Sequence, residues 1–367
     1  MSRHRWIGLA AAGVGTAAAA AAAGFAVERR VVRERRTGAE GADALGALRG
    51  EVRTVLTDDG VTLHAEVDEV APYAEAAKTH NGRRRRRQGD PTIVFVHGYA
   101  LTLDCWHFQR AYFRGKHRMV FYDQRSHGRS GRSDNAHATV DQLGHDLARV
   151  IGELAPEGPV VLVGHSMGGM SVMAFAEHHP EVFAERVVGV ALVSTAAGGL
   201  KTHHVVSRLI PDALAAQLAP RLVAGLAHAP GLVDRVRRRG SNIGYLVASQ
   251  FAFGDDVPAS YVELVDNMLA ATPFEVLAQF FPNFDTLDKF SVLERFADVP
   301  TYIVTGTEDV MTSVGLSRAM AGRIPGATLV ECPGAGHMVI LERKDRVNAT
   351  LDDLLAAATA PSASRVS

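Results

Sequence analysis

The segment from residue 159 to residue 175 constrains the fold of this chain more than any other stretch. An apolar run of β-forming residues, 160–163, stops at Gly164, and the sequence Gly-His-Ser-Met-Gly occupies positions 164–168. Small residues at helical spacing follow. The apolar run predicts a buried strand, and two glycines around a serine predict a very tight turn in which two backbones pass closely. We therefore expect a strand, a sharp turn with Ser166 at its apex, and a helix.

The spacing Gly-x-Ser-x-Gly in this strand–turn–helix context is typical of a nucleophile elbow. Ser166 would lie at a helix N-terminus, where backbone N–H groups and the helix dipole favour negative charge. The alternative is a serine in an ordinary turn between a strand and a helix. A serine hydroxyl is a weak nucleophile, so the rest of the chain must supply a base and a group that orients the base.

Strand and helix patterns alternate on both sides of this segment. Two alternating runs, 51–57 and 61–67, flank the turn Asp58-Asp59-Gly60 and predict a β-hairpin. Further strands are expected within 91–100, 117–123, 187–193, 301–305 and 327–331, and helices within 104–114, 139–154 and 338–358, with Thr139 as an N-cap and a helix after the elbow that ends at His179-Pro180. This alternation predicts an α/β fold with a doubly wound, mostly parallel sheet.

The 367 residues exceed what one simple core needs, so we divide the chain into parts. Residues 1–36 form an alanine-rich hydrophobic segment with a basic flank, and 37–50 form a linker. Residues 51–197 and 297–360 form the α/β core. Between them, the strand pattern gives way to helical segments rich in Phe, Leu and Met, which predict a helical lid at 198–296, after the sixth strand.

The N-terminal segment predicts attachment to a membrane. Residues 6–27 carry no charge and are long enough to span a bilayer as a helix. More arginines follow the segment than precede it, which favours an anchor with the core on the cytoplasmic face. Ala-x-Ala patterns near its end leave open a cleaved signal peptide and secretion, and a low-complexity tail is a third interpretation. The run Arg83–Arg87 is either a solvated loop or a contact for anionic lipid headgroups.

Four short stretches that follow strands in order carry a family resemblance. They are His97-Gly98-Tyr99, Gly164-His165-Ser166-Met167-Gly168, Gly306-Thr307-Glu308-Asp309 and Gly334-Ala335-Gly336-His337. From about residue 51 to residue 358 the chain resembles the α/β-hydrolase family, in the lid-bearing serine hydrolase branch similar to esterases and lipases. The resemblance implies the chain order of serine, then acid, then histidine.

The resemblance implies a catalytic triad of Ser166, Asp309 and His337. His337 follows the last strand in a glycine-bracketed loop, from which its ring could reach back over the elbow. Asp309 would accept the second ring N–H of His337 and stabilise the imidazolium. Glu308, next to Asp309, is the alternative acid. Some family members carry the acid after the sixth strand, but residues 194–197 of this chain offer no carboxylate.

A tetrahedral intermediate also needs hydrogen-bond donors for its oxyanion. The resemblance implies that the backbone N–H groups of Tyr99 and Met167 form this oxyanion hole. The other histidines in these motifs, His97, His127 and His165, are interpreted as structural residues rather than as second bases.

The serine at the elbow also restricts the chemistry. Epoxide hydrolases and haloalkane dehalogenases that resemble this fold need a carboxylate at that position, so Ser166 indicates a carbonyl substrate and an acyl-enzyme. We expect a small hydrophobic ester as the substrate. A cofactor-free C–C bond hydrolase or perhydrolase, and a ligand-binding hydrolase scaffold without turnover, are the alternatives. No phosphate loop or H-E-x-x-H motif indicates a cofactor or metal, and the net charge of −1 gives no reason to expect a nucleic-acid partner.

Overall fold

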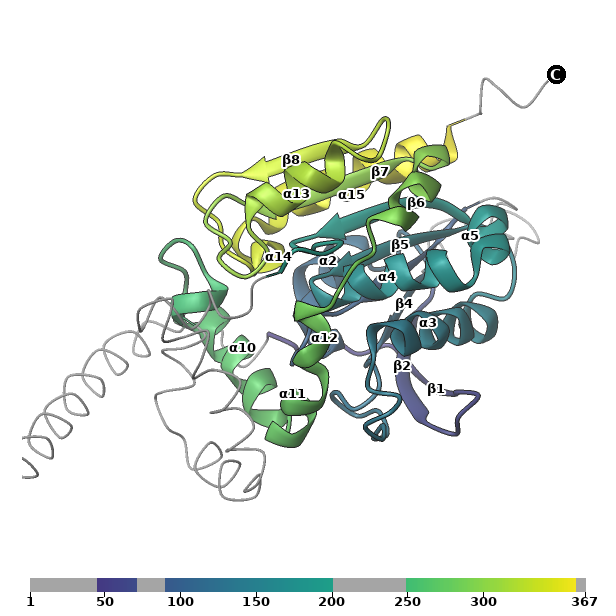
Figure 1. Ribbon diagram of the computed structural model, residues 1–367, viewed down its shortest axis with the longest axis horizontal. Helices are drawn as coiled ribbons and strands as arrows, with labels where there is room; N and C mark the ends of the chain where they lie inside the picture. Colours follow the sequence, from purple (N-terminus) through teal and green to yellow (C-terminus); the bar gives the residue numbers. More distant parts are fainter. Residues whose placement is uncertain (1–44, 71–89, 201–248, 361–367) are drawn as a thin grey trace, which may run out of the picture.

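The computed structural model describes residues 45–70, 90–200 and 249–360 (Figure 1). The predicted anchor or signal at 6–27 and the arginine run at 83–87 lie outside the described residues, as does much of the predicted lid. Within the described ranges, no helix has the length and apolar character needed to cross a membrane.

Eight strands form one sheet in the order β1-β2-β4-β3-β5-β6-β7-β8. The strands are β1 (Glu51–Leu56), β2 (Thr62–Asp68), β3 (Thr92–Val96), β4 (Met119–Tyr122), β5 (Val160–His165), β6 (Val187–Val193), β7 (Thr301–Gly306) and β8 (Thr328–Cys332). The β1–β2 hairpin is antiparallel and β2 pairs antiparallel with β4, whereas all other neighbours are parallel. The predicted fold class is therefore confirmed.

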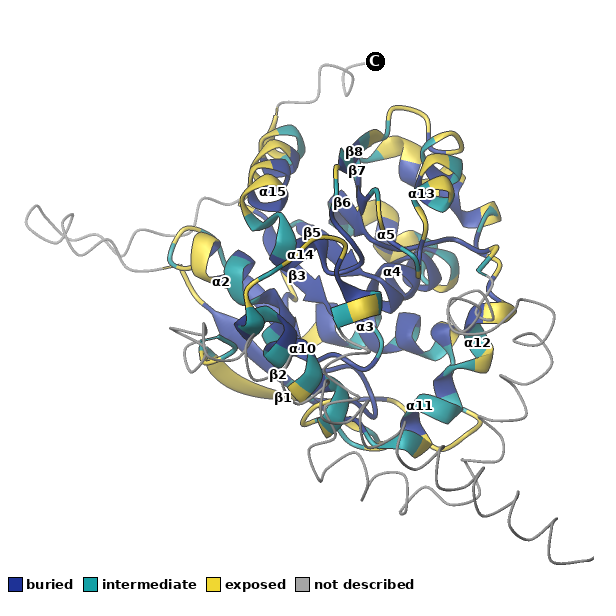
Figure 2. Ribbon diagram, turned by 90° about the vertical axis from the view of Figure 1, so that its left-hand side faces the viewer, coloured by how far each residue is buried: buried dark blue, intermediate teal, exposed yellow. Residues whose placement is uncertain are grey.

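Helices cover both faces of the sheet (Figure 1). The helices α3 (Val140–Leu154) and α4 (Met167–His178) share one hydrophobic cluster with the strands, and α2 (His107–Phe113) and α15 (Lys344–Thr359) share the other. Two further helices, α5 (Pro180–Arg186) and α13 (Val314–Ala321), had no counterpart among the expected elements. Figure 2 shows the central strands buried between helices whose outer sides are exposed. Such strands, buried on both faces, need the continuous apolar runs seen in the sequence.

Local signals placed most helix ends correctly. Thr139 caps α3 by accepting a hydrogen bond from the backbone N–H of Gln142 on its side-chain oxygen, and α4 ends at His179, before Pro180. The single helix expected over 338–358 is wrong, because α14 (Val339–Glu342) and α15 are separate elements. The break falls at Arg343, whose backbone has φ −127° and ψ 41°, and the side chains of Glu342 and Arg343 bind the backbone of the loop before α14.

A helical insertion lies between β6 and β7. Its described elements are α10 (Ala259–Ala271), α11 (Phe274–Phe280), α12 (Pro282–Asp285) and the 3₁₀ helix η4 (Ser291–Asp298). A second 3₁₀ segment, η3 (Leu103–Trp106), forms the first part of the helix expected at 104–114. The hydroxyl of Tyr99 donates to the carbonyl of Leu277 at 2.5 Å, so α11 lies against the loop that follows β3.

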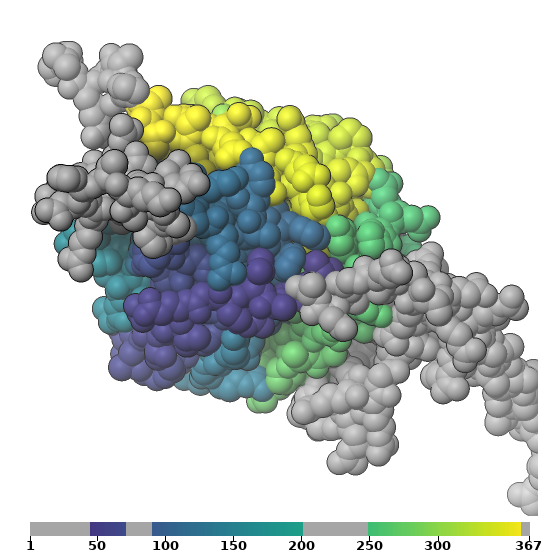
Figure 3. Space-filling view, turned by 180° about the vertical axis from the view of Figure 1, so that it is seen from behind, coloured from purple at the N-terminus to yellow at the C-terminus, as the bar shows by residue number. Residues whose placement is uncertain are grey.

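A buried guanidinium holds the β1–β2 hairpin against the core. The side chain of Arg125 is fully buried, and it donates to Asp146 on α3 at 2.6 Å and to Asp59 in the hairpin turn at 2.7 Å. The hydrogen bond from Arg125 lowers the pKa of Asp59 below its ordinary value. From behind, the hairpin forms the surface at one end of the molecule (Figure 3). Two ion pairs of one arginine therefore link the hairpin turn to α3.

The substitution Asp59→Asn is expected to lower the free energy of unfolding by about 1–2 kcal/mol at pH 7, because Arg125 loses a charged partner. The Asp59 carboxylate contributes fully to the free energy of unfolding above its pKa in the unfolded chain, which is near 4. This contribution is lost as the pH falls toward the lower pKa of Asp59 in the folded protein. Thermal unfolding of the wild-type protein and of Asp59→Asn should be measured from pH 7 to pH 2. The difference in stability between them should narrow below about pH 4.

Asp58→Asn is the matched control, because the Asp58 side chain in the same turn is 83% exposed. Equal destabilisation by the two variants would contradict the assignment, as would a difference that stays constant down to pH 2.

Candidate active site

The turn between β5 and α4 has the tight geometry predicted for it. Ser166 has φ 53° and ψ −121°, a backbone conformation that side-chain-bearing residues rarely adopt. A Cβ atom at Gly168 would lie 2.1 Å from the carbonyl oxygen of Val96, and one at Gly164 would lie 2.6 Å from the carbonyl oxygen of Gly168. Both positions therefore require glycine, because the backbones of β3, β5 and α4 meet there.

Several hydrogen bonds hold Ser166 in this strained conformation. Its backbone N–H donates to Val193 at 2.9 Å, and its carbonyl oxygen accepts from the Thr195 hydroxyl at 2.7 Å and from the Gly169 N–H at 2.9 Å. The Ser166 hydroxyl does not cap α4, and the residue is 8% exposed. A strained residue persists only when its surroundings fix it, and here the fixed backbone leaves the hydroxyl available for chemistry.

Asp309 and His337 are in direct contact. The loop after β7 carries Asp309 and the loop after β8 carries His337, and Nδ1 of the ring lies 2.9 Å from Oδ2 of the carboxylate. The carboxylate only accepts, so Nδ1 carries the proton and Nε2 is the nitrogen that can act as a base. Both side chains are buried, with exposed fractions of 7% for His337 and 0% for Asp309.

The structure separates Asp309 from its neighbour Glu308. Glu308 is exposed, whereas Oδ1 of Asp309 accepts hydrogen bonds from the backbone N–H groups of Met311 and Thr312, both at 2.9 Å. Burial by itself would raise the pKa of Asp309, but the charge of His337 and hydrogen bonds from His337 and Thr312 hold it below its ordinary value. Asp309 is therefore an anion fixed beside the histidine.

His165, the residue before Ser166, links the elbow to His337 by a hydrogen bond. Nε2 of His165 donates to the carbonyl oxygen of His337 at 3.0 Å, and the two rings lie 5.0 Å apart between centroids. Gly98, after β3, packs on the other side: a Cβ atom there would lie 3.0 Å from Cβ of Ser166. The elbow, the histidine loop and the loop after β3 thus meet at one edge of the sheet.

The two predicted oxyanion donors lie on the segments that enclose Ser166. Met167 is the first residue of α4, so its N–H is one of the groups that the helix itself does not satisfy. Tyr99 follows Gly98, and its ring packs edge-on against Phe284 with centroids 5.0 Å apart. The side chain of Tyr99 thus reaches the helical insertion, while its backbone belongs to the loop beside the elbow.

The other histidines of the motifs make structural contacts. Nδ1 of His97 donates to the carbonyl of Gly98 at 2.7 Å, and Nε2 accepts from the N–H of Gln124 at 2.9 Å. Burial lowers the pKa of His97 to about 4, and it lowers those of His127 and His165 to about 3. All three rings are therefore neutral at pH 7, and His97 has no ring nitrogen left for catalysis.

Sequence reasoning missed two residues at the site. The Thr312 hydroxyl donates to Oδ2 of Asp309 at 2.8 Å, and Glu342 accepts from the backbone N–H groups of Gly336 at 2.8 Å and Gly254 at 2.9 Å. The spacing of Thr312, three residues after an aspartate, is a local turn signal that could have been used. Glu342 gives no such signal, because one of its partners, Gly254, lies 88 residues away in the sequence.

The helical insertion contacts the histidine loop as well as the loop after β3. The N–H of Met338 donates to the carbonyl of Ala252 at 2.8 Å, beside the link from Gly254 to Glu342. A Cβ atom at Gly254 would lie 2.4 Å from the carbonyl oxygen of Gly334. Residues 252–254 therefore press directly against the loop that presents His337.

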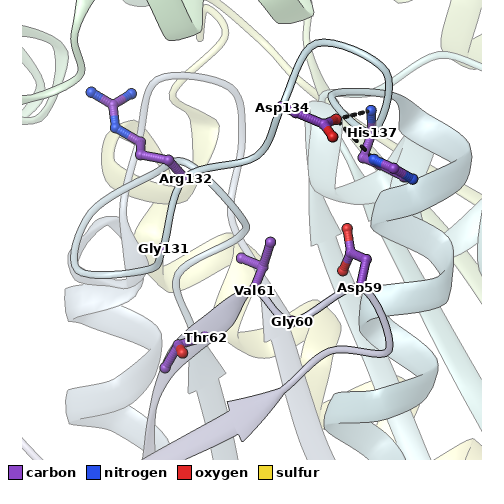
Figure 4. A pocket seen from close by; sticks show the side chains of 8 residues that line it. All are labelled: Asp59, Gly60, Val61, Thr62, Gly131, Arg132, Asp134 and His137. Atoms are coloured by element: carbon purple, nitrogen blue, oxygen red, sulfur yellow. Dashed lines mark hydrogen bonds and ion pairs between the residues drawn. The ribbon is translucent and has the colours of Figure 1, made fainter.

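A separate cavity of about 420 Å³ lies beside the β1–β2 turn, where Figure 4 shows Asp59, Arg132, Asp134 and His137. None of the predicted site residues lines it. Asp59 is bound by Arg125, and Asp134 accepts from the N–H and ring of His137 at 2.8 Å. The two carboxylates that line this cavity are therefore already paired within the protein.

One group on the described surface has the spacing of metal ligands, namely Asp141, Glu177 and His178. The ammonium group of Lys289 donates to Oδ1 of Asp141 at 2.5 Å and also to Oε2 of Glu177. A lysine therefore supplies the positive charge that these two carboxylates need, and we interpret the group as a salt-bridge network.

Comparisons with known proteins agree with this arrangement. The alpha/beta hydrolase family matches residues 93–350. The chain is 26% identical to 3-oxoadipate enol-lactonase 2 of Acinetobacter baylyi, covering 72% of this chain and 88% of that protein, and 27% identical to a non-heme haloperoxidase of Rhodococcus erythropolis, covering 71% and 90%. A thermophilic esterase from Thermogutta terrifontis has a similar fold, with a TM-score of 0.60, 21% identity, and coverage of 84% and 99%. The match along the sequence, with the sheet and the elbow, shows that the chain belongs to the alpha/beta hydrolase family.

Proposed function

We propose that this hydrolase cleaves carboxylic esters with hydrophobic acyl groups, through an acyl-enzyme formed on Ser166. The observation that carries the proposal is the buried pair of Asp309 and His337 at the same edge of the sheet as a strained serine turn. An activated serine, a base and an orienting acid are what nucleophilic acyl transfer requires.

In the proposed mechanism, Oγ of Ser166 attacks the ester carbonyl while Nε2 of His337 takes its proton. Asp309 holds the Nδ1–H and stabilises the imidazolium that forms. The N–H groups of Met167 and Tyr99 stabilise the oxyanion, each contributing on the order of 10²–10³ in rate. His337 then protonates the departing alcohol, and a water activated by the same histidine releases the acid.

The preference for an apolar acyl group is supported by the residues beside the oxyanion loop. Tyr99 packs against Phe284, and Phe281 lies next to Phe284 with a centroid distance of 6.5 Å. We propose that the helical insertion acts as a lid over the elbow and supplies apolar walls for the substrate. The enol-lactonase relative acts on a lactone, which is a cyclic ester, and this supports ester hydrolysis rather than another acyl transfer.

A cofactor-free perhydrolase or C–C bond hydrolase is the second candidate. The haloperoxidase among the relatives supports it, because its similarity to this chain is as extensive as that of the lactonase. A perhydrolase would form the same acyl-enzyme and transfer it to hydrogen peroxide instead of water. The esterase and the perhydrolase therefore differ in the acceptor of the acyl group, not in the nucleophile.

The first prediction concerns the nucleophile. A fluorophosphonate probe should label the protein at Ser166, and p-nitrophenyl esters of increasing chain length should be hydrolysed, with medium-length chains preferred. Ser166→Ala should abolish labelling and reduce hydrolysis by at least about 10³-fold. Peptide mass mapping identifies the labelled residue.

Absence of both labelling and Ser166-dependent turnover would refute the esterase proposal. Labelling without ester hydrolysis would favour the C–C bond hydrolase. Peracid formation that exceeds hydrolysis when peroxide is added would favour the perhydrolase.

The second prediction separates the two neighbouring acids. Asp309→Asn should lower kcat on p-nitrophenyl esters by about 10²–10⁴-fold, because the variant no longer fixes the tautomer of His337 or stabilises its positive charge. Glu308→Gln is the matched control and should retain nearly full activity, since Glu308 is exposed. The reverse ranking of the two variants would assign the acid to Glu308.

We also propose that the full chain is attached to a membrane through residues 6–27, with the hydrolase core on the cytoplasmic face. The uncharged stretch and its arginine flanks support the proposal. Full-length protein should sediment with membranes after cell fractionation, and a chain beginning at residue 37 should remain in the supernatant. Equal solubility of the two would refute it, and a secreted, shortened protein detected by mass would indicate a cleaved signal.

A further inference from the structure

The hydroxyl of Thr312 lies between the two members of the acid–histidine pair. Its oxygen is 2.8 Å from Oδ2 of Asp309 and 3.3 Å from Nδ1 of His337, and the residue is 3% exposed. The shorter distance identifies the carboxylate as the acceptor of its proton. Thr312 therefore binds the same carboxylate oxygen that receives the Nδ1–H of His337.

The carboxylate of Asp309 is consequently shared among four donors. Oδ1 accepts from the backbone N–H groups of Met311 and Thr312, and Oδ2 accepts from the Thr312 hydroxyl and the His337 ring. The two backbone donors bind Oδ1, whereas the hydroxyl binds Oδ2, the oxygen that faces the ring. Each additional donor withdraws charge from the oxygen that faces the histidine.

We propose that Thr312 is a positioning residue that aligns Oδ2 of Asp309 with Nδ1 of His337 and limits how strongly the carboxylate stabilises the protonated ring. The proposal rests on the function proposed above. When Ser166 attacks, its proton passes to Nε2 of His337, and the Nδ1–H stays on the ring. A carboxylate with its full charge would hold His337 protonated to higher pH and leave less neutral base.

Other charged groups near the ring do not replace this contact. From the end of β5, His165 bonds the backbone carbonyl of His337 and is itself neutral at pH 7. From α14, Glu342 binds the N–H of Gly336 rather than the ring, and Glu308 is exposed. Within the described residues, Asp309 and Thr312 are the side chains that contact Nδ1 of His337.

The test uses Thr312→Val, which keeps the side-chain shape and removes the donor, with Thr312→Ala as a second variant and Thr312→Ser as the control that keeps the hydroxyl. The rate of fluorophosphonate labelling of Ser166 is measured by intact mass from pH 5 to pH 9. In parallel, the ring resonances of His337 are titrated by NMR in the unlabelled protein.

For Thr312→Val and Thr312→Ala, we expect the acidic limb of the labelling profile to shift to higher pH by about half a pH unit or more. The plateau rate of labelling should fall about tenfold. The NMR midpoint of His337 should rise by the same amount, and Thr312→Ser should keep the wild-type midpoint. A purely structural role would lower the plateau or the thermal stability without moving the midpoint.

An unchanged midpoint of His337 in both Thr312→Val and Thr312→Ala, or an equal shift in Thr312→Ser, would overturn the inference. Failure of the wild-type protein to react with the probe would refute the proposed function instead. The NMR titration would then still decide the role of Thr312, since it requires no turnover.

Discussion

The close approach of three backbones at residues 164–168 is the constraint on which the site depends. The carbonyl oxygen of Val96 on β3 occupies the space that any side chain at position 168 would need. This contact forces α4 to start within one residue of the end of β5, and the positive φ of Ser166 follows from it. The serine is therefore placed by exclusion of volume, not by a hydrogen bond of its own side chain.

The base is placed by a different principle. His337 lies on a loop, and loops acquire a fixed position only through contacts with rigid neighbours. Here the neighbours are Asp309 at the ring, His165 at the backbone carbonyl, and Glu342 at the preceding glycine. Polar contacts from three separate elements thus hold the histidine, whereas close backbone packing and hydrogen bonds to its own backbone hold the serine.

The sequence was sufficient for features that depend on local chemistry. The apolar runs predicted the strands, Pro180 marked the end of α4, and Thr139 marked the start of α3. Asp309 and His337, which the resemblance placed side by side, lie in hydrogen-bond contact, while their catalytic roles stay a prediction. The separation of α14 from α15 gave no local signal that was recognised. The hydrogen bond from Gly254 to Glu342 could not be predicted, because it joins residues that only the tertiary fold brings together. Glu308 and Asp309 could likewise be told apart only by their burial, because the sequence does not show which of two adjacent acidic side chains is buried.

The helical insertion between β6 and β7 cannot be exchanged without affecting the loops of the core. Leu277 anchors the ring of Tyr99, Thr272 contacts the carbonyl of Ala100, and Ala252 accepts from Met338. A graft that replaced these helices to obtain a new specificity would also remove contacts that support the loop after β3 and the loop that carries His337. Recombination between relatives should therefore keep residues 252–254 and 272–277 together with the parental core.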